Sequence, residues 1–136
     1  MYTRVLYIIL LSIAILAMYS CQEKLQDRFV REAKEYTATY CPQRLDAFTV
    51  LDSMVFKPKG NAGDLRIYYS AHIDAEQREE LMNRLGELRE KNLKVVRNSV
   101  QFSKYKEAGV SFTYIYRDVS MGDKLAEFHF EKKDYE

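Results

Sequence analysis

The chain has 136 residues, of which 47% are hydrophobic and 30% are charged, and it contains only 5 Gly and 2 Pro. This composition predicts one globular domain and excludes collagen-like, low-complexity and disulfide-dense proteins. Lys and Arg number 21 against 20 Asp and Glu, which gives a formal net charge of +1. A chain with this balance lacks the positive excess that binds a phosphate backbone, so a nucleic-acid-binding protein is not expected.

The first twenty residues have the pattern of an export signal. Arg4 precedes an apolar run from Val5 to Met18 that is interrupted only by Ser12. The run is shorter than the roughly 20 apolar residues of a membrane-spanning helix, so we expect residues 1–20 to be a signal peptide that is cleaved. The alternative is an uncleaved anchor helix that runs from Val5 into Lys24. Both interpretations place the rest of the chain outside the cytoplasm.

A small residue stands directly before a cysteine at the end of this run. Ser20-Cys21 resembles the lipobox of bacterial lipoproteins, in which the cysteine sulfur receives a diacylglyceryl group and becomes the new N-terminus. The resemblance implies lipidation at Cys21, which attaches a single mature domain of residues 21–136 to a membrane. The following Gln22-Glu23-Lys24 is not an acidic cluster, so we expect the domain to face the periplasm.

The mature chain predicts an alternation of helices and hairpins. In chain order, the patterns of apolar residues indicate a helix over residues 25–40, strands over 46–57 and 65–71, a helix that begins after Asp74 and reaches Arg97, a short helical piece within 99–108, and strands over 110–117 and 125–130. Each pair of strands is separated by a turn and is expected to form a hairpin. The predicted class is therefore α+β, an α-β-β-α-β-β two-layer sandwich. We expect an antiparallel sheet of about four strands, covered on one face by two helices.

Local residues predict several details of these elements. Asp74 is expected to cap the second helix, with Gln77 completing a capping box. The broken alternation near Asp52-Ser53 predicts a β-bulge, and Phe48 is expected to face inward on the same strand. Gly109 is expected to end the short helical piece in a left-handed conformation.

Two short motifs resemble those of a known group of proteins. Tyr40-Cys41-Pro42 follows the first helix, and Tyr114-Ile115-Tyr116-Arg117-Asp118 ends a strand. In this order they resemble small uncharacterised bacterial envelope lipoproteins, of a Bacteroidetes-like kind, with a Cys-Pro after the first helix and a Tyr-x-Tyr-Arg-Asp strand. The resemblance supports the order of elements and implies no activity. Cysteines that the group carries further along are absent here, which leaves Cys41 either as a buried thiol or as a group able to bond another chain.

The outer face of the predicted sheet carries the candidate partner-binding residues. These are Arg66, Tyr68, His72, Ile115 and Arg117, which alternation places on the solvent side of two strands. An aromatic and basic patch of this kind suits a protein, peptide or glycan partner. The alternative interpretation is an ordinary open sheet face whose aromatic residues form cross-strand pairs.

Candidates for catalysis and metal binding are few. His72 lies close to Asp74 and Ser70 in sequence. His72 and Asp74 are only two good ligands, which is too few for a zinc site. No pattern around Ser70 indicates a nucleophile elbow. His129 alternates with Phe128 and Phe130 and is expected to face solvent. We therefore expect no cofactor, no metal and no catalytic residue.

Three hypotheses for function follow from these observations. The first is a non-enzymatic, lipid-anchored periplasmic domain that binds or scaffolds another component of the bacterial envelope. The second is a small envelope enzyme that uses His72 with Asp74 or Ser70. The third is an inhibitor or immunity-type lipoprotein, which would need a protruding loop at residues 58–63 or 118–123.

Overall fold

The computed structural model describes residues 1–9 and 23–136. Cys21 and the predicted cleavage site after Ser20 lie outside these residues, so lipidation and cleavage remain predictions. A short helix occupies residues 2–9. Within the two described ranges, no helix combines enough length with enough apolar character to cross a membrane.

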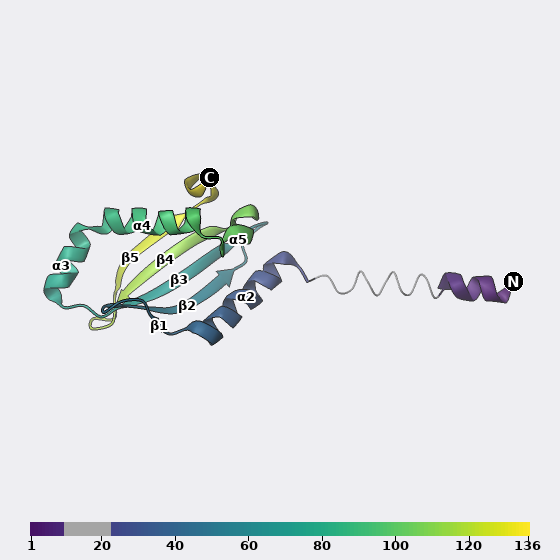
Figure 1. Cartoon of the computed structure of the whole chain (residues 1–136), viewed down its shortest axis with the longest axis horizontal. Coiled ribbons are helices and arrows are strands. Elements are labelled where there is room, and N and C mark those ends of the chain that lie inside the picture. Colours follow the sequence, from purple (N-terminus) through teal and green to yellow (C-terminus); the bar gives the residue numbers. More distant parts are fainter. Residues whose placement is uncertain (10–22) are drawn as a thin grey trace.

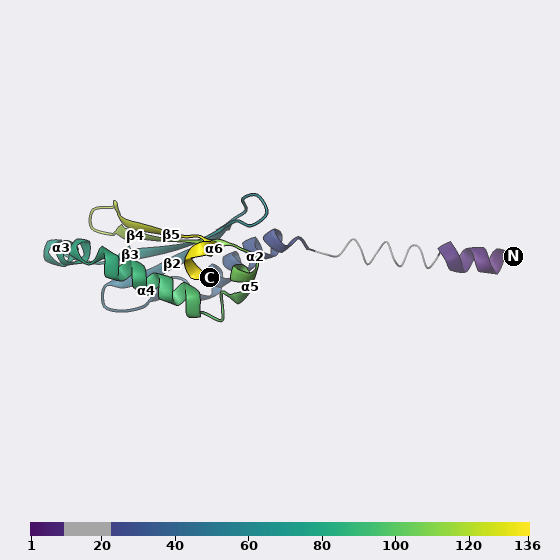
Figure 2. The same ribbon diagram turned by 90° about the horizontal axis from the view of Figure 1, so that it is seen from above.

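The domain has two layers, a sheet and a set of helices (Figure 1). Its elements are α2 (Leu25–Tyr40), β1 (Gln43–Arg44), β2 (Thr49–Lys57), β3 (Asp64–Ala71), α3 (Ala75–Asn83), α4 (Leu85–Asn98), α5 (Ser103–Glu107), β4 (Ser111–Asp118), β5 (Lys124–Phe130) and α6 (Lys132–Tyr135). The predicted α+β class is confirmed. Figure 2 shows α4 and α5 on one side of the sheet.

The sheet differs from the prediction in strand number and direction. It has five strands in the order β1-β2-β3-β4-β5, because a short strand precedes β2. The two predicted hairpins are confirmed, since β2 with β3 and β4 with β5 are antiparallel. However, β3 and β4 are parallel, so the sheet is mixed rather than antiparallel. The connection between them carries α3, α4 and α5 back along the sheet, and a long crossover of this kind brings the next strand in parallel to the first.

The core lies between the helices and one face of the sheet. Leu65 and Ile67 of β3 are buried on this face, and helix residues such as Phe29 and Val96 pack against it. The ring of Phe29 stacks on Tyr105 at 4.3 Å between centroids and meets Phe56 edge-on at 5.3 Å. Each large side chain buried in this way contributes roughly 1.5–3 kcal/mol. The core therefore joins α2, α5 and the central strands.

Helix α2 is also bonded to the edge of the sheet. The Met54 amide donates to Thr37 Oγ1 at 2.9 Å, and the Thr37 hydroxyl donates to the Met54 carbonyl at 2.9 Å. The predicted bulge in β2 is confirmed by a shift of register between Leu51 and Ser53. The Thr37 hydroxyl thus satisfies both polar groups of the Met54 backbone.

The second predicted helix is broken into α3 and α4 at Arg84, where φ is −114° and ψ is 19°. Its start is as predicted, because the Asp74 side chain accepts from the Gln77 amide at 2.8 Å and the capping box is complete. No residue of α3 is buried, whereas Val96 of α4 is fully covered. Helix α3 lies at the end of the sheet, and the bend allows α4 to run back along the sheet (Figure 1).

Candidate binding groove

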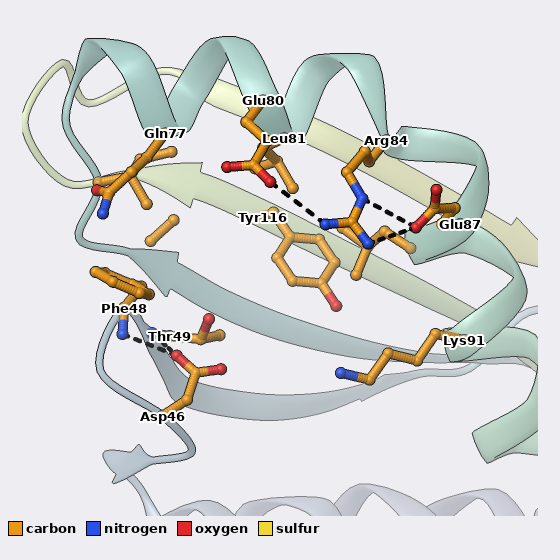
Figure 3. A pocket seen from close by; sticks show the side chains of 13 residues that line it. Asp46, Phe48, Thr49, Gln77, Glu80, Leu81, Arg84, Glu87, Lys91 and Tyr116 are labelled. Atoms are coloured by element: carbon orange, nitrogen blue, oxygen red, sulfur yellow. Dashed lines mark hydrogen bonds and ion pairs between the residues drawn. The ribbon is translucent and has the colours of Figure 1, made fainter.

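A groove of about 550 Å³ lies on the helix side of the sheet, at the end where α3 begins (Figure 3). Its floor is formed by Thr49, Ala71 and Tyr116 from three neighbouring strands. One wall is the loop between β1 and β2, and the other is made by α3 and α4. The volume falls in the range of typical ligand pockets, roughly 300–1,000 Å³.

Apolar side chains supply much of the lining. Leu81 and Leu88 from the helices and Ile73 after β3 are half-buried there. Phe48 lines the loop side and is 46% exposed. The prediction that Phe48 faces the core is therefore wrong, because the residue lies in the loop before β2 and not in the strand. An exposed aromatic ring beside half-buried leucines favours contact with an apolar partner.

Tyr116 is held in position at the base of the groove. The Asn92 amide donates to the Tyr116 hydroxyl oxygen at 2.9 Å, and that hydroxyl lies 3.2 Å from Asn92 Oδ1. Both residues are buried. Burial raises the pKa of Tyr116 to about 12, so the phenol is neutral at physiological pH.

Charged residues surround the apolar lining, and most of them are paired. The Arg84 guanidinium lies 2.7 Å from Glu87 and 3.4 Å from Glu80, and these carboxylates raise its pKa. Asp46 Oδ1 accepts from the amides of Phe48 and Thr49 at 2.8 Å each, and these bonds lower the pKa of Asp46.

The groove lies far from the segment that leads to Cys21. At the start of α2, Gln26 Nε2 donates to the carbonyls of Gly60 and Ala62, in the turn that joins β2 to β3. Thr49 and Ala71 line the groove at the opposite ends of these two strands. The 8 residues of β3 span about 25 Å, so the groove and the N-terminal end of the domain lie at opposite ends of the sheet.

The predicted outer-face residues are only partly brought together. Tyr68 pairs in register with Ile115, and the Arg66 guanidinium lies 6.0 Å from the Tyr68 ring centre. Ile115 is only 2% exposed, so the expectation that it faces solvent is wrong. It lies between Tyr68 and Glu127 of the flanking strands, whose longer side chains cover it.

Two further residues of that predicted patch lie at the end of the sheet. Arg117 pairs in register with Ser70 and is exposed, while His72 follows β3 and is exposed. A role for these five outer-face residues in partner binding remains a prediction. His129 is half-exposed as predicted, and its Nδ1 lies 2.8 Å from Thr113 Oγ1, which also bonds Asp64.

The residues proposed for an enzyme do not form a site. The Ser70 hydroxyl donates to Asp52, and Asp74 caps α3. Within the described residues, no hydrogen bond or ion pair joins His72 to either of them, and none of the three lines the groove. The same part of the chain contains no group of three or more His, Cys, Asp or Glu placed to hold a metal.

The two loops proposed for an inhibitor are both tied to the body of the domain. Gln26 bonds the turn at residues 58–63 through two carbonyls. Arg78 of α3 bonds Asp118 at 2.7 Å and Asp123 at 2.8 Å, which fixes the turn between β4 and β5.

Cys41 is a half-buried free thiol that packs against the core. Burial raises its pKa, which lowers its reactivity as a nucleophile. The peptide bond between Cys41 and Pro42 is cis.

The groove itself was not predicted. Its lining comes from five separate segments of the chain. In the sequence, several of its residues look like ordinary charged residues on the surface of a helix. Leu81 and Leu88 belong to the apolar pattern of the predicted second helix, and they are half-buried where they line the groove. Sequence periodicity identifies such residues but cannot tell a core contact from a groove wall.

Comparison with known proteins places this domain in a family. Residues 24–126 match the model of a domain of unknown function, DUF8479. The chain belongs to this family. The matched region of the DUF8479 domain runs from the residue before α2 into β5, so it includes every residue that lines the groove. No curated protein matches the sequence significantly.

Three solved structures share the fold of this DUF8479 domain at low sequence identity. A protein of Pseudomonas aeruginosa described as a candidate secreted protein has a TM-score of 0.65 and 16% identity, covering 85% of this chain and 100% of that one. The type 2 secretion system pilotin EpsS of Vibrio vulnificus has a TM-score of 0.55 and 11% identity, covering 82% and 92%. The type II secretion system pilotin AspS of Vibrio cholerae has a TM-score of 0.52 and 15% identity, covering 87% and 98%. At these identities the likeness shows the fold alone.

Proposed function

We propose that this DUF8479 domain is a non-enzymatic, lipid-anchored domain of the bacterial envelope that binds a segment of another envelope protein in the groove. The observation that carries the proposal is the position of the groove, at the end of the sheet opposite the start of α2. An acyl chain on Cys21 holds the start of α2 near the membrane, and the groove then points away from it. The sequence resemblance to small bacterial envelope lipoproteins agrees with this arrangement.

The similarity to pilotins of type 2 secretion systems supports a role in envelope assembly rather than catalysis. A membrane tether raises the effective concentration of a binding domain near its partner, so a modest affinity is sufficient for function. We propose that the domain works as an accessory protein of this kind, facing the periplasm.

Affinity capture of the acylated protein from its own envelope tests where the partner binds. Phe48→Glu places a charge on the apolar side of the groove, and Val95→Glu is the matched control on α4 outside the groove. Both residues are 46% exposed, so neither change is expected to unfold the domain. We expect Phe48→Glu to lose the co-purifying protein and Val95→Glu to retain it.

The same experiment separates the groove from the sheet face predicted earlier. Tyr68→Ala and Arg117→Glu alter the outer face and leave the groove lining intact. Loss of the partner in these two variants, with retention in Phe48→Glu, would move the binding surface to the outer face and refute the groove.

A further inference from the structure

Lys91 differs from the other charged side chains of the groove in its contacts. Five charged side chains line it, and four of them are engaged: Arg84 with Glu80 and Glu87, and Asp46 with two backbone amides. Lys91 makes no hydrogen bond or ion pair with any residue that the structure describes. Figure 3 shows its side chain extending from α4 into the groove, below the ring of Tyr116. Its charge contributes, after the backbone amides, to the lowered pKa of Asp46, but no described residue bonds the ammonium, so its hydrogen-bond donors are available to an anion.

An anion that binds there gains more than one at the open surface. Leu88 precedes Lys91 by about one turn of α4 and also lines the groove, and Figure 3 shows the ring of Tyr116 above the Lys91 side chain. A bound segment would exclude water from this space. Charge-assisted hydrogen bonds strengthen as the local dielectric falls. The pairing of Arg84 with two carboxylates leaves Lys91 as the cation available to a partner.

We propose that the partner segment is an acidic amphipathic peptide, whose apolar side chains pack against the lining of the groove and whose carboxylate side chain pairs with Lys91. This inference rests on the proposed function and adds the chemistry of the partner. The occupant is a peptide rather than a phospholipid of the anchoring membrane, because the groove lies about 25 Å from the tethered end of the domain.

Selection from a phage-displayed library of random linear peptides tests the inference. The library is selected on the wild-type domain of residues 23–136, on Lys91→Glu and on Lys94→Glu. Lys94 is the control because it is an exposed lysine of the same helix that does not line the groove. Circular dichroism checks that the three proteins are folded. Phe48→Glu, in which the groove is blocked, is used for counter-selection against peptides that bind elsewhere on the domain.

We expect wild type and Lys94→Glu to select apolar peptides with Asp or Glu at a constant position, and Lys91→Glu to select Lys or Arg there. For one selected peptide, fluorescence anisotropy is expected to give about tenfold weaker binding to Lys91→Glu, with recovery when the acidic residue of the peptide is changed to Lys. This recovery requires a direct pair and does not follow from a structural defect.

The other outcomes overturn one proposal or both. Peptides that depend on Phe48 but show no preference for acidic residues would refute the role of Lys91 and leave the groove as a binding site. A library in which nothing is enriched over Phe48→Glu would refute the proposed function as well. Co-sedimentation of the domain with phosphatidylglycerol vesicles that is lost in Lys91→Glu would assign the site to a lipid and overturn the peptide.

Discussion

Tyr116 shows how one hydrogen bond positions the base of the groove. Its hydroxyl is paired with Asn92 inside the fold, so removing the oxygen leaves a buried amide without a partner. We expect Tyr116→Phe to lower the free energy of unfolding by about 1–2 kcal/mol. Tyr114→Phe is the matched control, because Tyr114 lies on the same strand and its hydroxyl has no hydrogen bond among the described residues. Urea denaturation of both variants measures the difference, and equal losses would show that the Asn92 bond contributes nothing.

Asp118 is one residue through which pH acts on the stability of the fold. The hydroxyl and amide of Ser120 and the guanidinium of Arg78 bond its carboxylate and hold its pKa below the ordinary value. A carboxyl group with a lower pKa in the folded state stabilises the protein above its unfolded pKa of about 3.9, and this stabilisation is lost as the pH falls through the folded pKa. Asp123 contributes in the same direction, because Arg78 lowers its pKa too.

We therefore expect the free energy of unfolding to decrease as the pH falls from about 5 through the lowered pKa values of these two carboxyl groups. Asp118→Asn is expected to be less stable than wild type at neutral pH and to show a shallower dependence on pH. Urea titrations at a series of pH values give both quantities. Asp27→Asn is the control, since Asp27 is an exposed carboxyl of α2 that has no ion pair among the described residues. A variant Asp118→Asn with the full wild-type pH dependence would contradict this account.

Among the elements, α2 and β2 are joined by one hydroxyl in addition to their core packing. Thr37 bonds both the N–H and the carbonyl of Met54, which would otherwise lie unpaired beneath the helix. We expect Thr37→Val, which keeps the shape of the side chain, to cost about 1–2 kcal/mol of stability. Thr39→Val on the exposed side of the same helix is expected to have no measurable effect. Hydrogen exchange at the Met54 amide provides a local check, and continued protection in Thr37→Val would rule out the proposed bond.

The bend between α3 and α4 decides the shape of the groove. Arg84 ends one helix and pairs with Glu80 before it and Glu87 after it, so the bend and its ion pairs lie on the wall of the groove. A continuous helix, as the apolar stripe predicted, would not form this wall. The break is therefore the feature that lets the two helices form a wall of the groove.

For the whole molecule, the predicted attachment at Cys21 is what would give the groove its direction. Cys21→Ser removes the predicted acceptor of the diacylglyceryl group, and a protein without acyl chains has little affinity for the membrane. We expect the variant to leave the detergent phase in phase partitioning, either as soluble protein or as a precursor of higher mass. Lys24→Ser is a control close to the same site. Unchanged mass and partitioning of Cys21→Ser would refute the anchor and, with it, the orientation of the groove.

Much of the local structure was determined by the sequence alone. The amphipathic helix α2, the capping box at Asp74, the bulge near Asp52-Ser53 and the positive φ of Gly109 all follow from neighbouring residues, and each is confirmed. Such features depend on spacing and side-chain chemistry within a few residues, which the sequence states directly. The resemblance to envelope lipoproteins and the lipidation of Cys21 remain predictions of the same kind.

Only the tertiary structure decided how these elements meet. The parallel pairing of β3 with β4 depends on the path of the helical connection, and the burial of Ile115 depends on its two neighbours in the sheet. The groove assembles side chains from five segments, and only their pairing in space shows that Arg84 is bonded by carboxylates while no described residue bonds the Lys91 ammonium. These properties arise from contacts between residues far apart in the chain, and no local pattern of residues specifies them.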